Sequence, residues 1–171
     1  FIINDSKRID SLAGDLIEYA EGTREKVRVE KKTLKKIVND VLSELSSEVS
    51  ANQINVEVDI EAELDVWIDE MKFKKVIYNI IKNSIEASKG INDRIMIRAI
   101  EENDRIFLKI IDNGVGISKD ILDSVFEPMV TTKIQGTGLG LTIAREILTS
   151  HGFGLRIKSE RDAGTEITIV M

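Results

Sequence analysis

Apolar residues follow two different periods along this chain, and the order of the periods limits the folds that it can adopt. A period of 3.6 residues predicts amphipathic helices over 33–51, 69–88 and 139–150. A period of two residues, or a short apolar run, predicts strands at 54–60, 66–68, 94–101, 105–112, 153–158 and 166–171. The strands come mainly in hairpins and the helices come singly between them. We therefore expect an α+β fold, with helices on one face of a mixed, mostly antiparallel sheet.

One long segment carries neither period. Residues 113–137 hold three glycines, the only proline and one short stretch that could form a helix. Loops beyond about 12 to 15 residues are uncommon in compact domains, and those that occur are often lids or binding loops.

The composition fits one folded domain and excludes several classes of protein. The 171 residues include no cysteine, which excludes a disulfide scaffold, a zinc finger, an iron–sulfur site and a thiol nucleophile. The formal charge is −6, so nucleic acid and anionic lipid would find no net electrostatic attraction. No apolar run approaches the roughly 18 residues of a membrane span. We expect no nucleic-acid partner, no membrane insertion of this chain and a cytoplasmic location.

The first residues follow a heptad pattern, with apolar side chains at the a and d positions: Ile2, Ile9, Leu12, Leu16 and Tyr19. This pattern predicts a coiled-coil-like helix over 1–22, packed against another helix or against the main domain; periodicity leaves both open. A linker and first strand over 23–32 and a main domain over 33–171 would follow. Because the chain begins inside a helical pattern, we expect it to be a fragment of a longer protein.

Two asparagines lie within the helix predicted over 69–88. Asn79 and Asn83 are spaced i, i+4 and share one helix face, beside the apolar stripe. Asparagine is a poor helix former, and an amide oxygen can ligate Mg²⁺ without adding negative charge near a triphosphate. The alternative is a helix whose asparagines face solvent, and this pair alone favours that alternative.

The run Asp112-Asn113-Gly114-Val115-Gly116-Ile117 ends an apolar strand. Its glycines permit positive φ and a close backbone approach to a flat ligand. A carboxylate there can accept a hydrogen bond from the exocyclic amine of adenine, whereas guanine presents a carbonyl at that position. The alternative is an ordinary Asn-Gly turn.

The run Gly136-Thr137-Gly138-Leu139-Gly140-Leu141 leads into the helix predicted over 139–150. Glycines before a helix leave N–H groups free at the positive end of its dipole, which suits a phosphate. The spacing is neither a Rossmann fingerprint nor a Walker A loop. A flexible connector is the alternative, and these residues leave both open. Gly164-Thr165, before the last strand, has no meaning alone.

The order of the motifs is more specific than any one of them. Between the Asp-x-Gly-x-Gly and Gly-x-Gly-x-Gly motifs stands Phe126-Glu127-Pro128-Met129-Val130-Thr131-Thr132-Lys133. Together the motifs resemble the catalytic, ATP-binding domain of sensor histidine kinases, in the GHKL superfamily, over nearly all of residues 27–171. The residues of these motifs are most similar to those of the nitrogen-regulation and sporulation kinases. The resemblance implies a two-layer α/β sandwich, with ATP between the helices and a mobile lid at about 113–137.

The resemblance also implies roles for single residues. Asn83 matches the Mg²⁺ ligand, and with Asn79 and Lys133 it forms the expected catalytic set. Asp112 matches the adenine-binding aspartate, and Thr165 the threonine that supports it. The other nucleotide contacts it implies are Gly114, Gly116, Ile117, Phe126, Thr132, Gly136, Thr137, Gly138, Leu139 and Gly140.

One position departs from the family pattern. Many sensor kinases have a lysine three residues after the Mg²⁺ asparagine, where this chain has Glu86. Lys82 and Lys133 are therefore both candidates for the cation that contacts the β and γ phosphates.

The function implied by the resemblance is transfer of the γ-phosphoryl of Mg-ATP to a histidine, for relay to a response regulator aspartate. Residues 1–21 resemble the second helix of the family's dimerisation hairpin, which implies a homodimer and places the phosphoacceptor on a helix absent from this sequence. The only histidine, His151, is expected to be structural, at a helix C-terminus whose partial negative charge favours it.

Three alternatives stay open: another GHKL ATPase, a protein serine kinase, and a non-catalytic nucleotide-sensing interaction module. The hydrolases of the superfamily carry a general-base glutamate one turn before the Mg²⁺ asparagine. This chain has Asn79 there, which argues against water activation.

Overall fold

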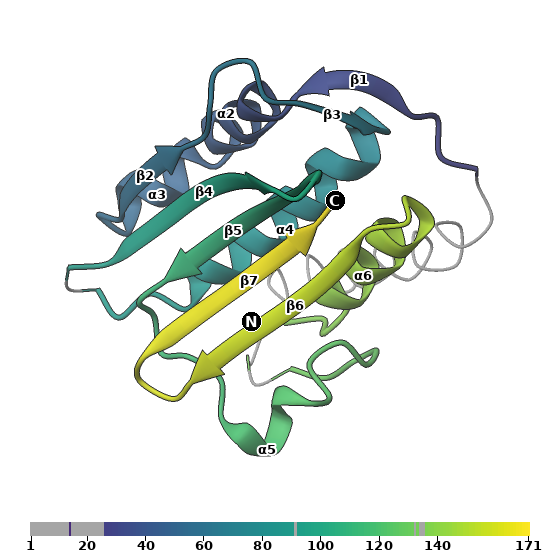
Figure 1. Ribbon diagram of the computed structural model, residues 1–171. Coiled ribbons are helices and arrows are strands. Elements are labelled where there is room, and N and C mark those ends of the chain that lie inside the picture. Colours follow the sequence, from purple (N-terminus) through teal and green to yellow (C-terminus); the bar gives the residue numbers. More distant parts are fainter. Residues whose placement is uncertain (1–13, 15–25, 91, 132, 134–135) are drawn as a thin grey trace.

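The computed structural model describes residue 14 and residues 26–90, 92–131, 133 and 136–171. Its main sheet has five strands in the order β2-β4-β5-β7-β6 (Figure 1). Their bounds are β2 Asn55–Asp59, β4 Arg94–Glu102, β5 Arg105–Asp112, β6 Gly154–Glu160 and β7 Gly164–Val170. Strand β2 runs parallel to β4 and every other neighbouring pair is antiparallel, which confirms the expected mixed sheet.

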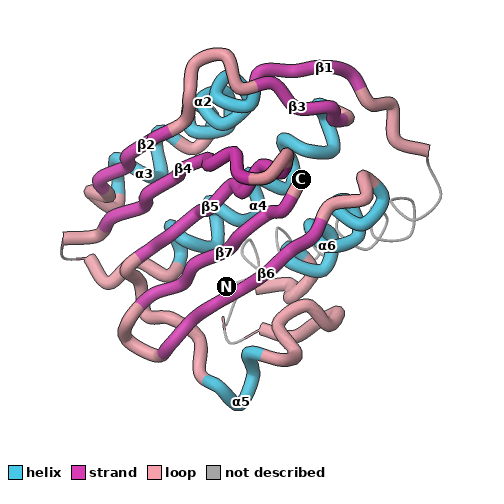
Figure 2. Tube along the Cα trace, in the orientation of Figure 1, coloured by secondary structure: helices cyan, strands magenta, loops and turns pink. Residues whose placement is uncertain are grey.

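Three helices cover one face of this sheet (Figures 1 and 2): α2 Leu34–Glu44, α4 Glu70–Glu86 and α6 Gly140–Ser150. Helix α4 lies between the other two and packs against both. The core fills the space between the two layers with fully buried side chains, among them Phe73, Ile77, Ile80, Ile97, Leu108 and Ile110. The predicted two-layer arrangement is confirmed, and it holds the polar residues of α4 next to the ends of the strands.

The helix predicted over 33–51 is divided in two. It breaks at Leu45, which lies between α2 and the short helix α3 Ser46–Ala51. The hydroxyl groups of Ser43 and Ser46 donate to backbone carbonyls at 2.9 and 2.7 Å, and serine competes with helical hydrogen bonding in this way. Because Leu45 is fully buried, the break leaves the apolar face of the segment on the core.

A separate antiparallel pair joins β1 Glu30–Thr33 to β3 Asp65–Ile68, directly before α4. The first strand expected within 23–32 therefore lies at its end and extends one residue beyond it. The helix predicted over 1–22 lies outside the described residues, apart from Gly14, which is helical. The proposed domain boundaries stay a prediction.

Two of the expected hairpins are present, with tight turns between β4 and β5 and between β6 and β7. Asn103 and Asp104 have φ of 52° and 58°, as expected for a two-residue turn that follows the twist of its strands. Residues 113–137 contain only the short helix α5 Lys119–Leu122 among their described positions.

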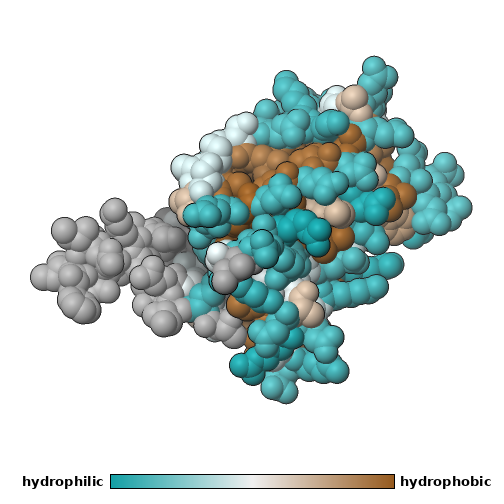
Figure 3. All heavy atoms as spheres, turned by 90° about the vertical axis from the view of Figure 1, so that its left-hand side faces the viewer, coloured by the Kyte–Doolittle hydropathy of each residue, from teal (hydrophilic) through white to brown (hydrophobic). Residues whose placement is uncertain are grey.

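Seen from the side of β2 and α3, apolar residues form a band between polar margins (Figure 3). The half-buried Val56 and Val58 of the edge strand β2 pack against the core on this side. No helix in the described ranges is long and apolar enough to cross a lipid bilayer.

Candidate functional site

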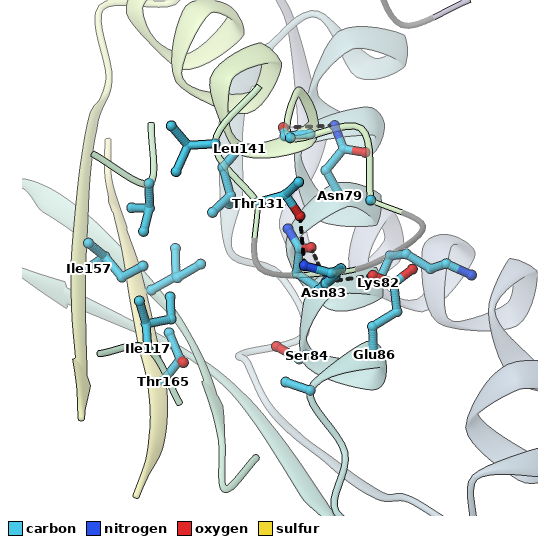
Figure 4. Close-up of a pocket in the computed structure, with 18 of the residues that line it drawn as sticks. Asn79, Lys82, Asn83, Ser84, Glu86, Ile117, Thr131, Leu141, Ile157 and Thr165 are labelled. Atoms are coloured by element: carbon cyan, nitrogen blue, oxygen red, sulfur yellow. Dashed lines mark hydrogen bonds and ion pairs between the residues drawn. The ribbon is translucent and has the colours of Figure 1, made fainter. Parts of the chain in front are cut away.

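A cavity of about 550 Å³ lies between α4, the start of α6 and the segment that follows β5 (Figure 4). Cavities of this size commonly hold small molecules. Its polar lining includes Asn79, Asn83, Ser84, Glu86, Asp112, Lys133 and Thr165. Its apolar lining includes Ile117, Ile121, Val125, Leu141, Ile157 and Ile167. The structure thus brings together residues from five of the motifs recognised in the sequence.

Asp112 is the last residue of β5, and its side chain is buried with only 8% of its surface exposed. Its Oδ1 accepts hydrogen bonds from the backbone N–H groups of Gly114 at 3.0 Å and Thr165 at 3.2 Å. Its Oδ2 accepts from the hydroxyl group of Ser84 at 3.0 Å. An ionised carboxylate has about four acceptor positions, so one position on Oδ2 is left for a donor in the cavity.

The electrostatics of Asp112 reflect its burial. Loss of solvent raises the pKa of this carboxyl above its usual value, although the hydrogen bonds from Gly114, Ser84 and Thr165 act in the opposite direction. The site therefore holds a carboxylate that lacks solvent and is held in a fixed orientation.

Thr165 contacts Asp112 through its backbone and not through its hydroxyl group. Its backbone N–H makes the bond to Asp112, while its hydroxyl group lies 2.9 Å from that of Ser159. Ser159 in turn accepts a hydrogen bond from the N–H of Ile117 at 2.8 Å. The partner hydroxyl of Asp112 is Ser84, which the sequence showed only as a polar residue on the apolar stripe of α4.

The first glycine motif is required mainly by protein packing. A Cβ on Gly114 would lie 2.5 Å from the carbonyl oxygen of Ala87, at the end of α4. A Cβ on Gly116, which has a φ of 65°, would lie 2.0 Å from the carbonyl oxygen of Glu160. Gly116 lines the cavity, whereas Gly114 packs against Ala87 and is not among the lining residues, so its ligand contact stays a prediction.

The second glycine motif forms the entry to α6, where Gly136, Thr137, Gly138 and Gly140 line the cavity. Leu139, the N-cap of α6, makes no side-chain cap hydrogen bond, so within the described residues the first-turn N–H groups lack a cap from this position. The side-chain amide of Asn79 donates to the carbonyl of Gly140 at 3.1 Å. Asn79 therefore connects α4 to this helix start, and an anion in the cavity would meet the positive end of the α6 dipole.

Asn83 lies one turn after Asn79 and faces the same cavity (Figure 4). Its Oδ1 accepts a hydrogen bond from Nζ of Lys133 at 2.7 Å, and the same Nζ lies 2.5 Å from Oε2 of Glu86. Lys82, the other candidate cation, forms an ion pair with Glu48 of α3. The lysine beside the proposed Mg²⁺ asparagine is thus Lys133.

Two of the expected contact residues, Leu139 and Phe126, do not line the cavity. Leu139 is buried in the core, with 1% of its surface exposed. Phe126 is half-buried outside the cavity, where its ring receives the guanidinium of Arg145 at 5.7 Å and its carbonyl accepts from Thr142 at 3.1 Å. Thr132 lies outside the described residues.

A sequence profile of the histidine kinase-, DNA gyrase B-, and HSP90-like ATPases matches residues 68–171. This range is more than half of the chain and contains the whole cavity. The chain belongs to this ATPase family. The fold expected from the motif order is therefore confirmed both by the family match and by the sheet topology.

Individual proteins that are similar to this chain are named as kinases. Sporulation kinase D of Bacillus subtilis (strain 168) is 40% identical over 99 residues, 57% of this chain and 19% of that kinase. The catalytic domain of histidine kinase ThkA is 26% identical with a TM-score of 0.76, over 84% of this chain and 95% of that chain.

A structure of ThkA in complex with response regulator protein TrrA is 22% identical with a TM-score of 0.82. It covers 99% of this chain and 48% of that chain. By contrast, this chain spans only about a fifth of the length of the curated kinases that it matches.

Proposed function

We propose that this chain is the ATP-binding kinase domain of a sensor histidine kinase and that it binds Mg-ATP in the cavity between α4 and α6. The observation that carries the proposal is that Asp112 and Asn83, two functionally different polar groups, line one cavity. Sporulation kinase D and ThkA, which share the family, are both named as kinases.

Adenine would lie at the Asp112 end of the cavity. The free acceptor position on Oδ2 can take a hydrogen bond from the exocyclic amine of adenine, whereas the carbonyl of guanine would face a carboxylate. The side chains of Ile117, Ile157 and Ile167 provide an apolar lining for the flat base. Asp112 is held in place by Ser84 and the two N–H groups, so it needs no rearrangement to bind the base.

The phosphates would lie at the Asn83 end, next to the start of α6. No three His, Cys, Asp or Glu side chains form a metal-binding group within the described residues. A neutral amide oxygen fits Mg²⁺ that takes its other ligands from phosphate and water, so Asn83 would hold the ion by Oδ1. Magnesium, when bound, would neutralise charge on the phosphate oxygens. The first N–H groups of α6 and Nζ of Lys133 would supply the remaining positive charge.

The chemical step is transfer of the γ-phosphoryl group to an imidazole nitrogen. A P–N bond forms, the bond between the γ phosphorus and the β–γ bridging oxygen breaks, and ADP leaves. Such catalysis depends on positioning and on charge neutralisation, so the role of the cavity is to hold the γ-phosphate in line with the acceptor. Asn79 contributes by holding the start of α6 against α4.

His151 is not the proposed acceptor, because both of its ring nitrogens have partners in the fold. It follows the last residue of α6, about 16 Å along the helix from Gly140. The acceptor would lie on a separate dimerisation helix, with a response regulator aspartate as the next recipient. We place these reactions in the cytoplasm, where ATP is available.

The test is a phosphotransfer assay with this chain, labelled Mg-ATP and a separate dimerisation hairpin that carries a histidine. Acid-labile label should appear on the hairpin and should require both proteins, and Asn83→Ala should abolish it. Label on His151, or release of inorganic phosphate with no label on any hairpin tested, would contradict the proposal.

A further inference from the structure

Glu86 lies one helical turn after Asn83 on α4, and both side chains hold the same ammonium group. Nζ of Lys133 is 2.5 Å from Oε2 of Glu86 and 2.7 Å from Oδ1 of Asn83. Lys133 lies in the segment before the second glycine motif, 47 residues after Glu86. Two consecutive turns of one helix thus bind a cation from a distant part of the chain, and all three side chains line the cavity.

The two contacts differ in how they respond to a nucleotide. Oδ1 of Asn83 is the atom that the proposed function gives to a metal ion. If it ligates a dication, it cannot keep the ammonium as well, because two positive charges would then share one oxygen atom. The carboxylate of Glu86 has no such second role. The ion pair between Glu86 and Lys133 can therefore persist when the bond to Asn83 is lost.

The backbone of Lys133 makes local hydrogen bonds within its own segment. Its N–H donates to the hydroxyl group of Thr131 at 3.0 Å, and its carbonyl accepts from the N–H of Gly136 at 3.2 Å. Lys82, which also lines the cavity, is already paired with Glu48 on the side of α3.

We propose that Glu86 is a positioning residue for recognition of the terminal phosphate, an inference that rests on the proposed function. Glu86 keeps Nζ of Lys133 in the cavity after Asn83 releases it, so that the ammonium faces the γ-phosphate. A triphosphate gains this charged hydrogen bond and a diphosphate does not. Glu86 is thus a negatively charged side chain that increases the preference for the more negatively charged nucleotide.

The test measures the affinities for Mg-ADP and a non-hydrolysable Mg-ATP analogue by calorimetry and compares their ratio between variants. If Glu86 acted only through its charge, Glu86→Gln would relieve repulsion and increase the preference for the triphosphate. If it positions Lys133, Glu86→Gln lowers that preference about tenfold, because a charged hydrogen bond loses its orientation. Glu86→Asp keeps the charge and should retain part of the preference.

Two controls make the result specific. In a chain that already carries Lys133→Met, adding Glu86→Gln should not lower the preference for the triphosphate any further. No ammonium is then left to position. Glu70→Gln breaks ion pairs with Lys32 and Lys74 on the same helix but outside the cavity, and should leave the ratio unchanged.

A ratio that stays constant or rises in Glu86→Gln contradicts the inference, as does a decrease that persists without Lys133. Thermal unfolding checks each variant. If Glu86→Gln does not fold, Glu86→Asp should still lower the ratio partly, because it shortens the side chain at constant charge, and an unchanged ratio in Glu86→Asp would then contradict the inference. If the unsubstituted chain binds neither nucleotide, the proposed function is wrong, and this inference falls with it.

Discussion

The backbone N–H of Asp69 donates a 3.0 Å hydrogen bond to Nε2 of His151, across 82 residues of sequence. The other ring nitrogen, Nδ1, donates to the carbonyl of Ile147 at 2.7 Å. With Nε2 as the acceptor, Nδ1 is the nitrogen that donates. Asp69 is the N-cap of α4 and His151 the C-cap of α6, so this ring joins opposite ends of the two helices that line the cavity.

His151→Ala should lower the free energy of unfolding by about 2 kcal/mol, because it leaves a half-buried N–H unpaired and removes ring contacts. Those contacts are with Phe153, at 5.5 Å between centroids, and Phe73, at 6.5 Å. Ser150→Ala is the matched control, because its hydroxyl donates to the same Ile147 carbonyl without reaching α4. Chemical denaturation measures both variants. Equal effects would show that the link to Asp69 adds nothing.

Asp112→Asn should fold, because the amide can satisfy the same partners. Its Oδ1 would accept from Gly114 and Thr165, and its Nδ2 would donate to the hydroxyl group of Ser84. The raised pKa of Asp112 means that the folded state holds its proton more tightly than the unfolded chain. Its contribution to stability is therefore present at low pH and is lost as the pH rises through the raised pKa.

Asparagine has no carboxyl proton to release, so Asp112→Asn should not show this loss of stability as the pH rises. As the pH rises above the ordinary aspartate pKa of about 4, the free energy of unfolding of Asp112→Asn should increase relative to that of the unsubstituted chain. Denaturant titrations at several pH values measure this difference. A difference that shrinks with rising pH would mean that the carboxylate stabilises the empty fold, contrary to its buried position.

The sequence predicted the layers, the hairpins and the polar groups of the cavity, because periodicity and motif order are local signals. Asn83, Asp112 and Gly116 line one cavity, and their roles toward a nucleotide stay predictions. The supporting contacts could not be predicted, since Ser84 and Asp112 are 28 residues apart and their hydrogen bond depends on the tertiary fold. His151 lies at the C-terminus of α6 as expected, but its hydrogen bond from Asp69, 82 residues away, could not be read from the sequence.

The reason for the glycines at 114 and 116 also could not be predicted from the sequence alone. The sequence indicated that the glycines at 114 and 116 permit positive φ and a close approach to a ligand, and Gly116 does have a φ of 65°. The structure shows that backbone atoms of Ala87 and Glu160 occupy the space that a side chain would take. Only the packing of distant segments separates a glycine required by the fold from one required by the nucleotide.

Gly116→Ala and Gly140→Ala form a matched pair that tests this distinction. A Cβ at 116 would meet a carbonyl oxygen at 2.0 Å with φ of 65°, so the free energy of unfolding should fall by at least about 2 kcal/mol. A Cβ at 140 would lie 3.7 Å from Asn79, an ordinary contact, and alanine favours the helix. Thermal and chemical unfolding measure both variants. Equal stability of the two would contradict the packing at Gly116.

Asn79→Ala tests whether this residue orders the start of α6. Loss of the bond to the Gly140 carbonyl should lower the free energy of unfolding by about 1 kcal/mol. Affinity for Mg-ATP should fall as well, because the first turn of α6 is no longer held against α4. The control Asn52→Ala removes a similar bond, from an exposed side chain to the Glu48 carbonyl at 2.8 Å. Unchanged nucleotide affinity in Asn79→Ala would argue against a role in the site.

The most direct test of the account is calorimetric titration of the chain with ATP and with GTP, each with magnesium. ATP should bind at least about tenfold more tightly, because the free acceptor position of Asp112 meets an amine on adenine and a carbonyl on guanine. Asp112→Asn should remove most of this preference. Equal binding of ATP and GTP by the unsubstituted chain, or binding of neither, would contradict the assignment of this cavity as an adenine nucleotide site.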